Sequence, residues 1–268
     1  MAQERWERFI SNLGVYVYGL AAIALGVLGL IWGDFATNWQ RVPADIPHHL
    51  AVARAAAIYE LVAGVGMLWR GTRRVSALLL TGIYTVFVLL WVDRVVAHPL
   101  TYDNWGNVFE ELSLVAAGMI VYASQGAGMG RWRAAGFAIN AYGVCVVSFA
   151  LVHIIYLPGA ASFVPKWIPL GGPFWAGATA ICFMCAAAAI FAGLLASLAT
   201  RLLTLMIALF GLLVWLPMLI AQPHVHFIWS GNAINFALLA AAWVVADYFA
   251  VRDRQRAAAR KRLAEVRV

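Results

Sequence analysis

Glu60 is the residue of this 268-residue chain whose surroundings most clearly point to chemistry. It lies in the middle of an apolar run, Ala-Ala-Ala-Ile-Tyr-Glu-Leu-Val-Ala-Gly. An ionisable side chain at the centre of a membrane helix costs at least about 2.5–3.5 kcal/mol, so it should face the interior of a helix bundle and have a partner there. We expect its carboxyl group to act either as a proton carrier or as a structural hydrogen-bonding group.

Helical periodicity places Glu60 on a stripe of small residues that leads to His49. The stripe recurs at helical spacing through His49, Ala53, Ala56, Ala57, Glu60 and Gly64. Either another helix packs closely on it, or a cavity opens above Glu60 towards His49. Arg54 lies about 120° away around the same helix. We therefore expect Arg54 to pair with a carboxylate of another segment, and the candidates are Asp34, Asp93, Glu110 and Glu111.

The remaining titratable residues gather near the ends of apolar segments, at one level. They are His48, His49, His98, His153, His224 and His226, with Asp34, Asp45, Asp93, Asp103, Glu110 and Glu111. Histidine with carboxylate suits borderline metals and also proton relays. Because no spacing matches a metal motif, we assign no metal site. The layer is then either a relay for protons or a quinone headgroup, or a set of ordinary interfacial side chains.

These patterns define the predicted site. Glu60, Glu110 and Glu111 are predicted to carry the chemistry. The residues predicted to contact a ligand are Arg54, His49, Trp91, Trp105 and His153. Tryptophans at this level also anchor helices at the membrane interface. Cys182-Phe-Met-Cys185 and Cys145 fall at mid-depth, where nothing would activate a thiol, and we expect all three cysteines to be packed in the core.

Composition identifies the class of protein. Hydrophobic residues make up 64% of the chain and charged residues 12%, against about 45–50% and 25% in soluble domains. A polytopic membrane protein is therefore predicted, with the lipid bilayer as its main partner. About 20 apolar residues span a bilayer, and eight segments approach that length: 13–33, 51–69, 75–92, 107–124, 134–156, 174–199, 202–221 and 231–250.

The basic residues predict the orientation. In an eight-span arrangement, 15 of the 19 lysines and arginines fall on one side, which by the positive-inside rule is cytoplasmic. Both termini are then cytoplasmic, in a bacterial-type inner membrane. The net charge of +7 is explained by topology, and no nucleic-acid partner is predicted.

A repeated hexapeptide divides the chain. Val-Pro-x-x-Ile-Pro occurs at 42–47 and at 164–169, and other pairs such as Trp105 and Trp229 recur at nearly the same interval. We predict a duplication: a first four-helix unit in residues 1–128, a second in 129–250, and a basic cytoplasmic tail in 251–268. The predicted fold is all-α transmembrane, with eight helices in two parallel-inserted four-helix bundles. The proline loops should be non-helical caps. The tail should extend the last helix and lie along anionic headgroups or dock a partner.

The first unit resembles the DoxX-like family of small four-helix membrane proteins. The likeness rests on the Trp39 to Pro47 loop, Glu60, the basic turn from Arg70 to Arg74, His98-Pro99, and Glu110-Glu111. That family includes the small subunit of a thiosulfate:quinone oxidoreductase and membrane partners of redox-protective enzymes. The resemblance implies an accessory, quinone-interacting subunit of a redox system, with a redox partner protein or a larger membrane complex.

Two other functions fit the same residues. In the first, Glu60 carries protons in a proton-coupled transporter or permeation pathway whose two repeats move against each other. In the second, the chain is a structural scaffold for a membrane complex. The second unit has no carboxylate at the positions of Glu60 and Glu111, so any chemistry is predicted to belong to the first unit.

Overall fold

Apolar sequence folds into long helices along almost the whole chain. The computed structural model describes residues 13–125 and 129–265, and every regular element in them is helical. In chain order the elements are α2 (Leu13–Trp32), α3 (His49–Met67), α4 (Arg73–Leu90), α5 (Val92–Ala97), α6 (Tyr102–Ser124), α7 (Met129–Ile155), α8 (Leu157–Ser162), α9 (Gly171–Ala192), α10 (Ala196–Phe210), the π-helical turn η1 (Gly211–Trp215), α11 (Leu216–Ala221) and α12 (His226–Glu265).

The lengths of these helices indicate a multi-pass membrane protein. Within the described residues, seven helical segments are long and apolar enough to cross a membrane. The predicted fourth span is also a helix, α6, of 23 residues. It is not among the seven, because Asp103, Glu110 and Glu111 make its first half polar. The prediction of eight apolar spans therefore differs from the structure at this acidic helix.

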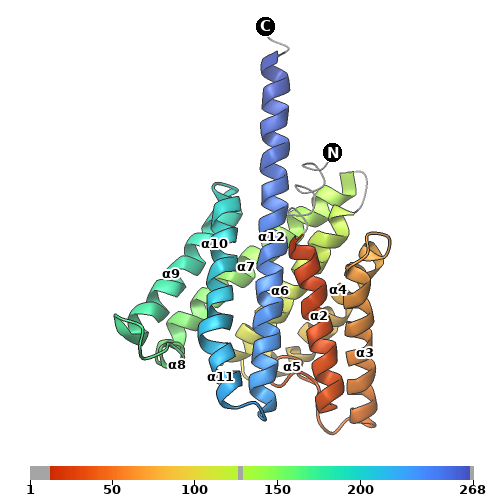
Figure 1. Cartoon of the computed structure of the whole chain (residues 1–268), viewed down its shortest axis with the longest axis vertical. Helices are drawn as coiled ribbons and strands as arrows, with labels where there is room; N and C mark the ends of the chain where they lie inside the picture. Colours follow the sequence, from red (N-terminus) through yellow and green to blue (C-terminus); the bar gives the residue numbers. More distant parts are fainter. Residues whose placement is uncertain (1–12, 126–128, 266–268) are drawn as a thin grey trace.

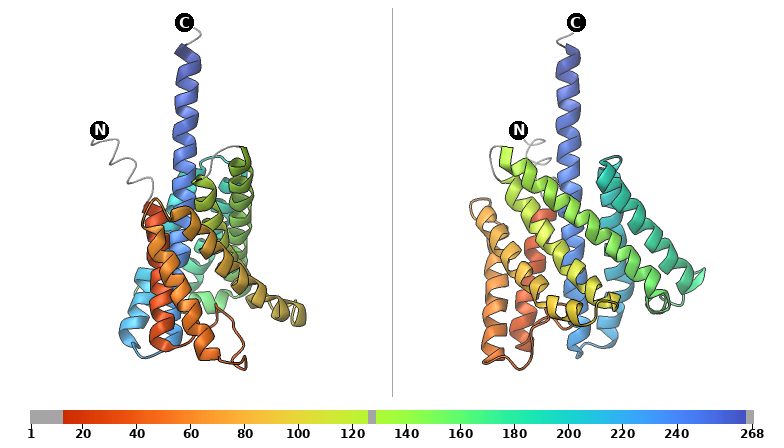
Figure 2. Two further views of the ribbon diagram at one scale, coloured as in Figure 1. Left: turned by 90° about the vertical axis from the view of Figure 1, so that its right-hand side faces the viewer. Right: turned by 180° about the vertical axis from the view of Figure 1, so that it is seen from behind.

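The helices do not form two separate four-helix bundles. In the first half α2 packs on α3, α3 on α4, and α4 on α6. The second half repeats this order, with α7 on α9, α9 on α10, and α10 on α12. The first helix of each half packs on the last helix of the other half: α2 on α12, and α7 on α6. The two last helices, α6 and α12, also touch each other. Figures 1 and 2 show α6 and α12 crossing at the centre of the molecule.

Small residues allow this close packing. A methyl group at Gly14 would overlap the α12 backbone at Trp243 and Val244. A methyl group at Gly19 of α2 or at Gly64 of α3 would likewise overlap the other of these two helices. Close backbone approach through small residues is the usual way for helices to associate in lipid. The buried core accordingly runs without interruption through both halves.

Both proline loops are non-helical, as predicted. In each, the isoleucine amide bonds the carbonyl of the first proline, Ile46 to Pro43 and Ile168 to Pro165. In each, a left-handed residue then starts the next helix, His48 with φ 58° before α3 and Leu170 with φ 74° before α9. These loops lie at the opposite end of the molecule from the start of α2 and the end of α12 (Figure 1).

The basic tail is a straight continuation of α12. Residues 253–265 are exposed on all sides and, at 1.5 Å per residue, extend the helix by about 20 Å. Figure 1 shows the tail projecting from the helix ends along the α12 axis. The predicted helical extension is confirmed. A straight helix leads away from the plane of the helix ends, however, which differs from the expectation that it lies along the headgroups.

Candidate functional site

The packing of α2 on α3 determines where Glu60 points. On α3 the buried positions are Ala53, Ala57, Glu60, Ala63, Gly64 and Met67, which is the predicted stripe continued to the end of the helix. A methyl group at Gly26 of α2 would overlap the α3 backbone at Ala57 and Leu61. Of the two arrangements predicted for the stripe, close helix packing is therefore the one observed. Glu60 is left only 2% exposed.

The bonding partner of Glu60 comes from a loop. The side-chain amide of Gln40 donates a 2.7 Å hydrogen bond to Glu60 Oε1, and its oxygen accepts one from the Ala36 amide. Gln40 is itself buried. Gln40 was not predicted from the sequence, because helical periodicity does not relate a loop residue to a helix residue twenty positions later. The expectation that Glu60 has a partner is confirmed.

Glu111 shares the same interior without any bond. Its side chain is 1% exposed, and neither carboxylate oxygen has a hydrogen-bond partner in the structure. Glu60 and Glu111 are close enough to interact electrostatically with each other and with the hydroxyl groups of Tyr18 and Tyr84. Four helices therefore meet at one buried polar cluster: α2 gives Tyr18, α3 gives Glu60, α4 gives Tyr84 and α6 gives Glu111.

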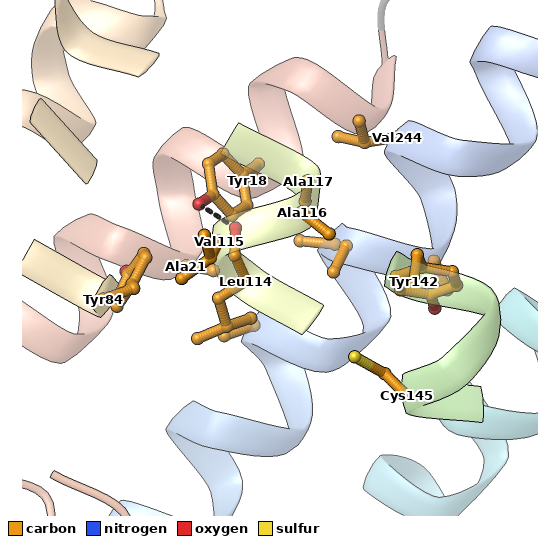
Figure 3. Packing of buried hydrophobic residues seen from close by; sticks show 14 of the residues in the cluster. Tyr18, Ala21, Tyr84, Leu114, Val115, Ala116, Ala117, Tyr142, Cys145 and Val244 are labelled. Carbon is orange, nitrogen blue, oxygen red and sulfur yellow. Dashed lines mark hydrogen bonds between the residues drawn. The ribbon is translucent and has the colours of Figure 1, made fainter. Parts of the chain in front are cut away.

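The two tyrosines form one wall of this cluster. Tyr18 donates a 2.8 Å hydrogen bond to the Leu114 carbonyl of α6, drawn as a dashed line in Figure 3. The Tyr18 and Tyr84 rings meet edge to face with centroids 6.3 Å apart. Both side chains are 1% exposed. The cluster is thus closed by ring contacts and by a bond to the α6 backbone.

No positive charge in the described part of the chain forms an ion pair with either acid. The ion pairs among the described residues are Arg41 with Asp93, His49 with Asp34, and Arg252 with Asp253. The buried Arg73 lies eleven residues before Tyr84 on α4, which is about 16 Å along the helix axis. The described residues also contain no group of three side chains that could hold a metal ion. Two carboxyl groups within electrostatic range of each other are therefore buried in a low-dielectric interior.

Glu110, the third predicted acid, serves a neighbouring loop. It accepts a hydrogen bond from the indole nitrogen of Trp39, and the Trp39 carbonyl accepts a 2.9 Å bond from the indole of Trp91. The Trp39 ring stacks on Phe227 of the second half at 5.6 Å. Glu110 and Trp91 thus bond the loop of Gln40 to the first half, and the stacking of Trp39 on Phe227 joins it to the second half.

A polar pocket lies on the loop side of the cluster. It encloses about 380 Å³, and its walls are Asp34, Phe35, Ala36, Thr37, Asn38, Gln40, Arg41, Val42, Trp91, Arg94 and Asn104. Gln40 is both part of the pocket wall and the bonding partner of Glu60. The pocket therefore connects the surface at the loop end with the buried carboxyl pair through a single amide side chain.

Several predicted ligand residues lie elsewhere. Arg54 is exposed and belongs to no ion pair among the described residues, so its predicted pairing with a carboxylate is wrong; Arg41 is the arginine that pairs with Asp93. His49 lies 3.7 Å from Asp34. Trp105 donates only to the Pro99 carbonyl of its own turn. Arg41 lies in an irregular loop, so no helical periodicity points to its pairing with Asp93.

His153 belongs to the second half. Its ring lies 5.2 Å from that of Phe183 and 6.0 Å from that of Phe210. Its Nδ1 is 2.8 Å from the Phe149 carbonyl of its own helix. His153 therefore packs among aromatic rings and is not part of the Glu60 cluster.

The cysteines differ from expectation in one respect. Cys145 is buried, as predicted. Cys182 and Cys185 are exposed on the outer side of α9, so core packing was the wrong prediction for them. The buried face of α9 passes through Phe183 instead, one position away around the helix.

The second half has a non-ionisable counterpart of the site. The buried positions of α9 each lie 123 residues after a buried position of α3: Ala176, Ala180, Phe183, Ala186, Ala187 and Ile190. Phe183 thereby corresponds to Glu60. Asn235, which lies 124 residues after Glu111, is also buried and donates to the Ile207 carbonyl. The same helical positions hold a carboxyl pair in the first half and a phenyl ring with an amide in the second.

No family model, curated protein or solved structure matches this chain. The site is therefore interpreted from its own geometry.

Proposed function

We propose that this chain is a multi-pass membrane protein that binds and transfers protons through the Glu60–Glu111 pair. One observation carries the proposal. Glu111 is buried with both oxygens unbonded, beside a second buried carboxyl group whose hydrogen bond comes from the neutral amide of Gln40. This arrangement supports a proton-coupled transporter or permeation pathway over a purely structural role, since a structural carboxyl group would be expected to have its bonds satisfied.

The physical argument concerns charge. Two carboxylates without a counter-ion cannot both be ionised in a low-dielectric interior, because like charges there repel strongly and each loses its hydration. The pair must then hold at least one proton. Neither oxygen of Glu111 lies within hydrogen-bond distance of Glu60, so a proton passes between the two acids only after a side-chain rotation or through a bridging water molecule, and such a transfer is the elementary step of a proton pathway.

The direction of access follows from the pocket. A proton entering from the loop end meets Gln40, which can release Glu60 by rotating its side chain. From Glu60 the proton can pass to Glu111, on the other side of the cluster. By the distribution of basic residues, the loop end is proposed to face away from the cytoplasm of a bacterial-type inner membrane.

Proton transfer can be measured in liposomes. We expect the purified chain, reconstituted in vesicles that contain a pH-sensitive dye, to acidify the lumen when outward potassium diffusion through valinomycin makes the lumen negative. Glu60→Gln and Glu111→Gln should abolish that flux, and Arg54→Gln, on the exposed side of α3, should not change it. Flux that persists in Glu60→Gln would reject the proposal. Loss of assembly alone in that variant would favour the scaffold function.

A second candidate is a quinone-interacting subunit of a redox system. It is supported by the aromatic and acidic groups around the Gln40 loop, where Trp39, Trp91 and Glu110 are joined by hydrogen bonds, and by the DoxX-like features of the first half. Quinone reduction consumes protons as well as electrons, so a buried acid pair would suit it too. Lipid extracts of gently purified protein, examined by mass spectrometry, would contain quinone in stoichiometric amount; its repeated absence would exclude this candidate.

We also propose that the two halves arose by duplication of one four-helix unit. The equal order of helix contacts in each half and the matching buried stripes of α3 and α9 support it. Local bonds recur as well. Thr81 and Thr204, 123 residues apart, each bond the carbonyl four residues earlier. Pro99 and Pro223, 124 residues apart, each accept a bond from a tryptophan indole.

The interval between corresponding residues of the two halves increases from 123 at Thr81 and Thr204 to 124 at Pro99 and Pro223, and the proposal gives this increase a physical origin. Between these two pairs of residues the second half contains η1, a π-helical turn, whereas the first half has the end of α4 and the start of α5. A π-turn accommodates one residue more than an α-turn. An inserted residue would be absorbed there, leaving the helix on either side in register.

A further inference from the structure

The polar pocket at the loop end is lined by two arginine side chains. Arg41 uses its Nη1 atom for its hydrogen bonds to the Leu90 carbonyl and to Asp93, and its other guanidinium nitrogens bond no other described residue. The guanidinium of Arg94 takes part in no hydrogen bond or ion pair among the described residues, although Asp93 lies near it in the chain. Both arginines line the pocket.

The pocket wall contains two arginines and a single acidic side chain, Asp34, one oxygen of which is bonded. Asp34 Oδ1 accepts a 2.8 Å bond from the Phe35 amide and lies 3.7 Å from His49. Guanidinium groups recognise carboxylate and other oxyanions through paired N–H donors. The wall therefore favours an anion over a cation, with Arg94 as the group available to bind it.

The rest of the wall suits an organic group. Phe35 and Trp91 provide ring surfaces, and the Arg41 guanidinium lies over the Trp91 ring at 5.8 Å. The volume of about 380 Å³ is within the range of small-molecule sites. A small acid with an apolar body would place its carboxylate on the arginines and its body on the rings.

We propose that this pocket binds a small organic carboxylate, and that binding is linked to proton uptake by the Glu60–Glu111 pair through Gln40. The linkage rests on the proposed function above, whereas the binding itself does not. An anion bound at the Gln40 wall places negative charge beside Glu60 and favours the protonated form of the pair. The titratable groups that interact with the pair are Tyr18, Tyr84 and, next to Glu111, Glu110. Those at the pocket are Asp34, Arg41, Arg94, His49 and Asp93.

Calorimetry with benzoate tests the binding. The full chain in nanodiscs should bind sodium benzoate, and inorganic phosphate should bind more weakly because it cannot use the rings. Arg94→Gln should weaken benzoate binding at least tenfold, whereas Arg54→Gln, which removes an arginine outside the pocket, should leave it unchanged. Arg41→Gln provides a second pocket variant if Arg94→Gln does not fold. The assignment would be overturned if the native chain did not bind benzoate or bound phosphate more tightly. It would also be overturned if Arg94→Gln and Arg41→Gln both bound benzoate as tightly as the native chain.

The proton linkage is tested in the same titrations. Repeating them in two buffers of different ionisation enthalpy gives the number of protons taken up on binding. We expect proton uptake in the native chain and none in Glu60→Gln, which should still bind benzoate. If Glu60→Gln still takes up protons, another group such as His49 is the acceptor and the linkage is overturned, while the carboxylate pocket stands and the proposed function is decided by the liposome flux. If the native chain binds benzoate without proton uptake, the linkage is overturned.

Discussion

Phe183 occupies on α9 the position that Glu60 occupies on α3, 123 residues later and within the same sequence of buried small residues. Around Glu60 lie polar groups, and around Phe183 lie the rings of Phe149, His153 and Phe210. One backbone arrangement thus supports two different interiors. The first contains two buried carboxyl groups, and the second is filled by aromatic packing. A substitution in the first interior should therefore show what the acids cost in stability.

Glu111→Leu should stabilise the protein. The carboxyl group of Glu111 is buried and unbonded, and replacing such a group with an apolar side chain of similar volume should recover about 1–3 kcal/mol of desolvation cost. The measurement is the melting temperature in detergent. Glu110→Leu is the matched control and should lower the melting temperature, because Glu110 accepts the Trp39 indole bond. A large loss of stability in Glu111→Leu would mean that Glu111 has a bonded partner.

Gln40→Leu should have the opposite effect. It removes the 2.7 Å bond to Glu60 and leaves a buried oxygen without a partner, which costs about 1–3 kcal/mol. The melting temperature should fall, and the double variant with Glu60→Leu should recover most of the loss, because both partners are then apolar. Asp45→Ala, an exposed change in the same loop, should be neutral. Equal losses in the single and double variants would contradict the assignment of this bond.

The sequence was sufficient to identify the buried face of α3 but not the partners of its glutamate. Periodicity fixes which residues share a helix face, so Glu60 and its small neighbours were predictable. The contact from Gln40 depends on the path of an irregular loop, and the absence of a bond at Glu111 depends on how four helices meet. Likewise, helix spans follow from composition, but the closing of each half by α6 or α12 of the other depends on contacts between helices distant in the chain.

Asp247→Asn should weaken the contact between the two halves. Asp247 of α12 accepts a 2.8 Å hydrogen bond from the Gly14 amide at the start of α2, where a negative charge also interacts favourably with the helix dipole. Loss of the charge should cost about 0.3–1 kcal/mol, the usual range for a charge at a helix terminus, since the asparagine oxygen can still accept the Gly14 bond. Asp253→Asn, on the exposed part of the same helix, is the control and should change the melting temperature little. Equal effects of the two variants would show that the Gly14 contact contributes nothing.

The interlocked halves should assemble when made as separate chains. Residues 1–128 alone leave α2 without α12, and residues 129–268 alone leave α7 without α6. We expect each piece to aggregate or be degraded when expressed singly, and the two to copurify as a heterodimer when expressed together. Affinity purification through a tag on one piece measures this. Stable monomers of the separate pieces would show that each half forms a complete bundle of its own.

Removing Leu212 tests whether η1 holds an extra residue. Leu212 is exposed within the π-turn, so its deletion should convert the turn to regular α-helix while α10 and α11 keep their contacts. The deletion would disturb the hydrogen bond from Asn232 to the Trp215 carbonyl. We therefore expect the free energy of unfolding to fall by no more than about 1 kcal/mol, the net value of one hydrogen bond. Deleting the exposed Leu89 of α4, where no π-turn is present, should shift Trp91 off the Trp39 carbonyl and destabilise the protein far more. Melting temperatures of the two deletions decide the matter: equal destabilisation would mean that η1 does not absorb an insertion.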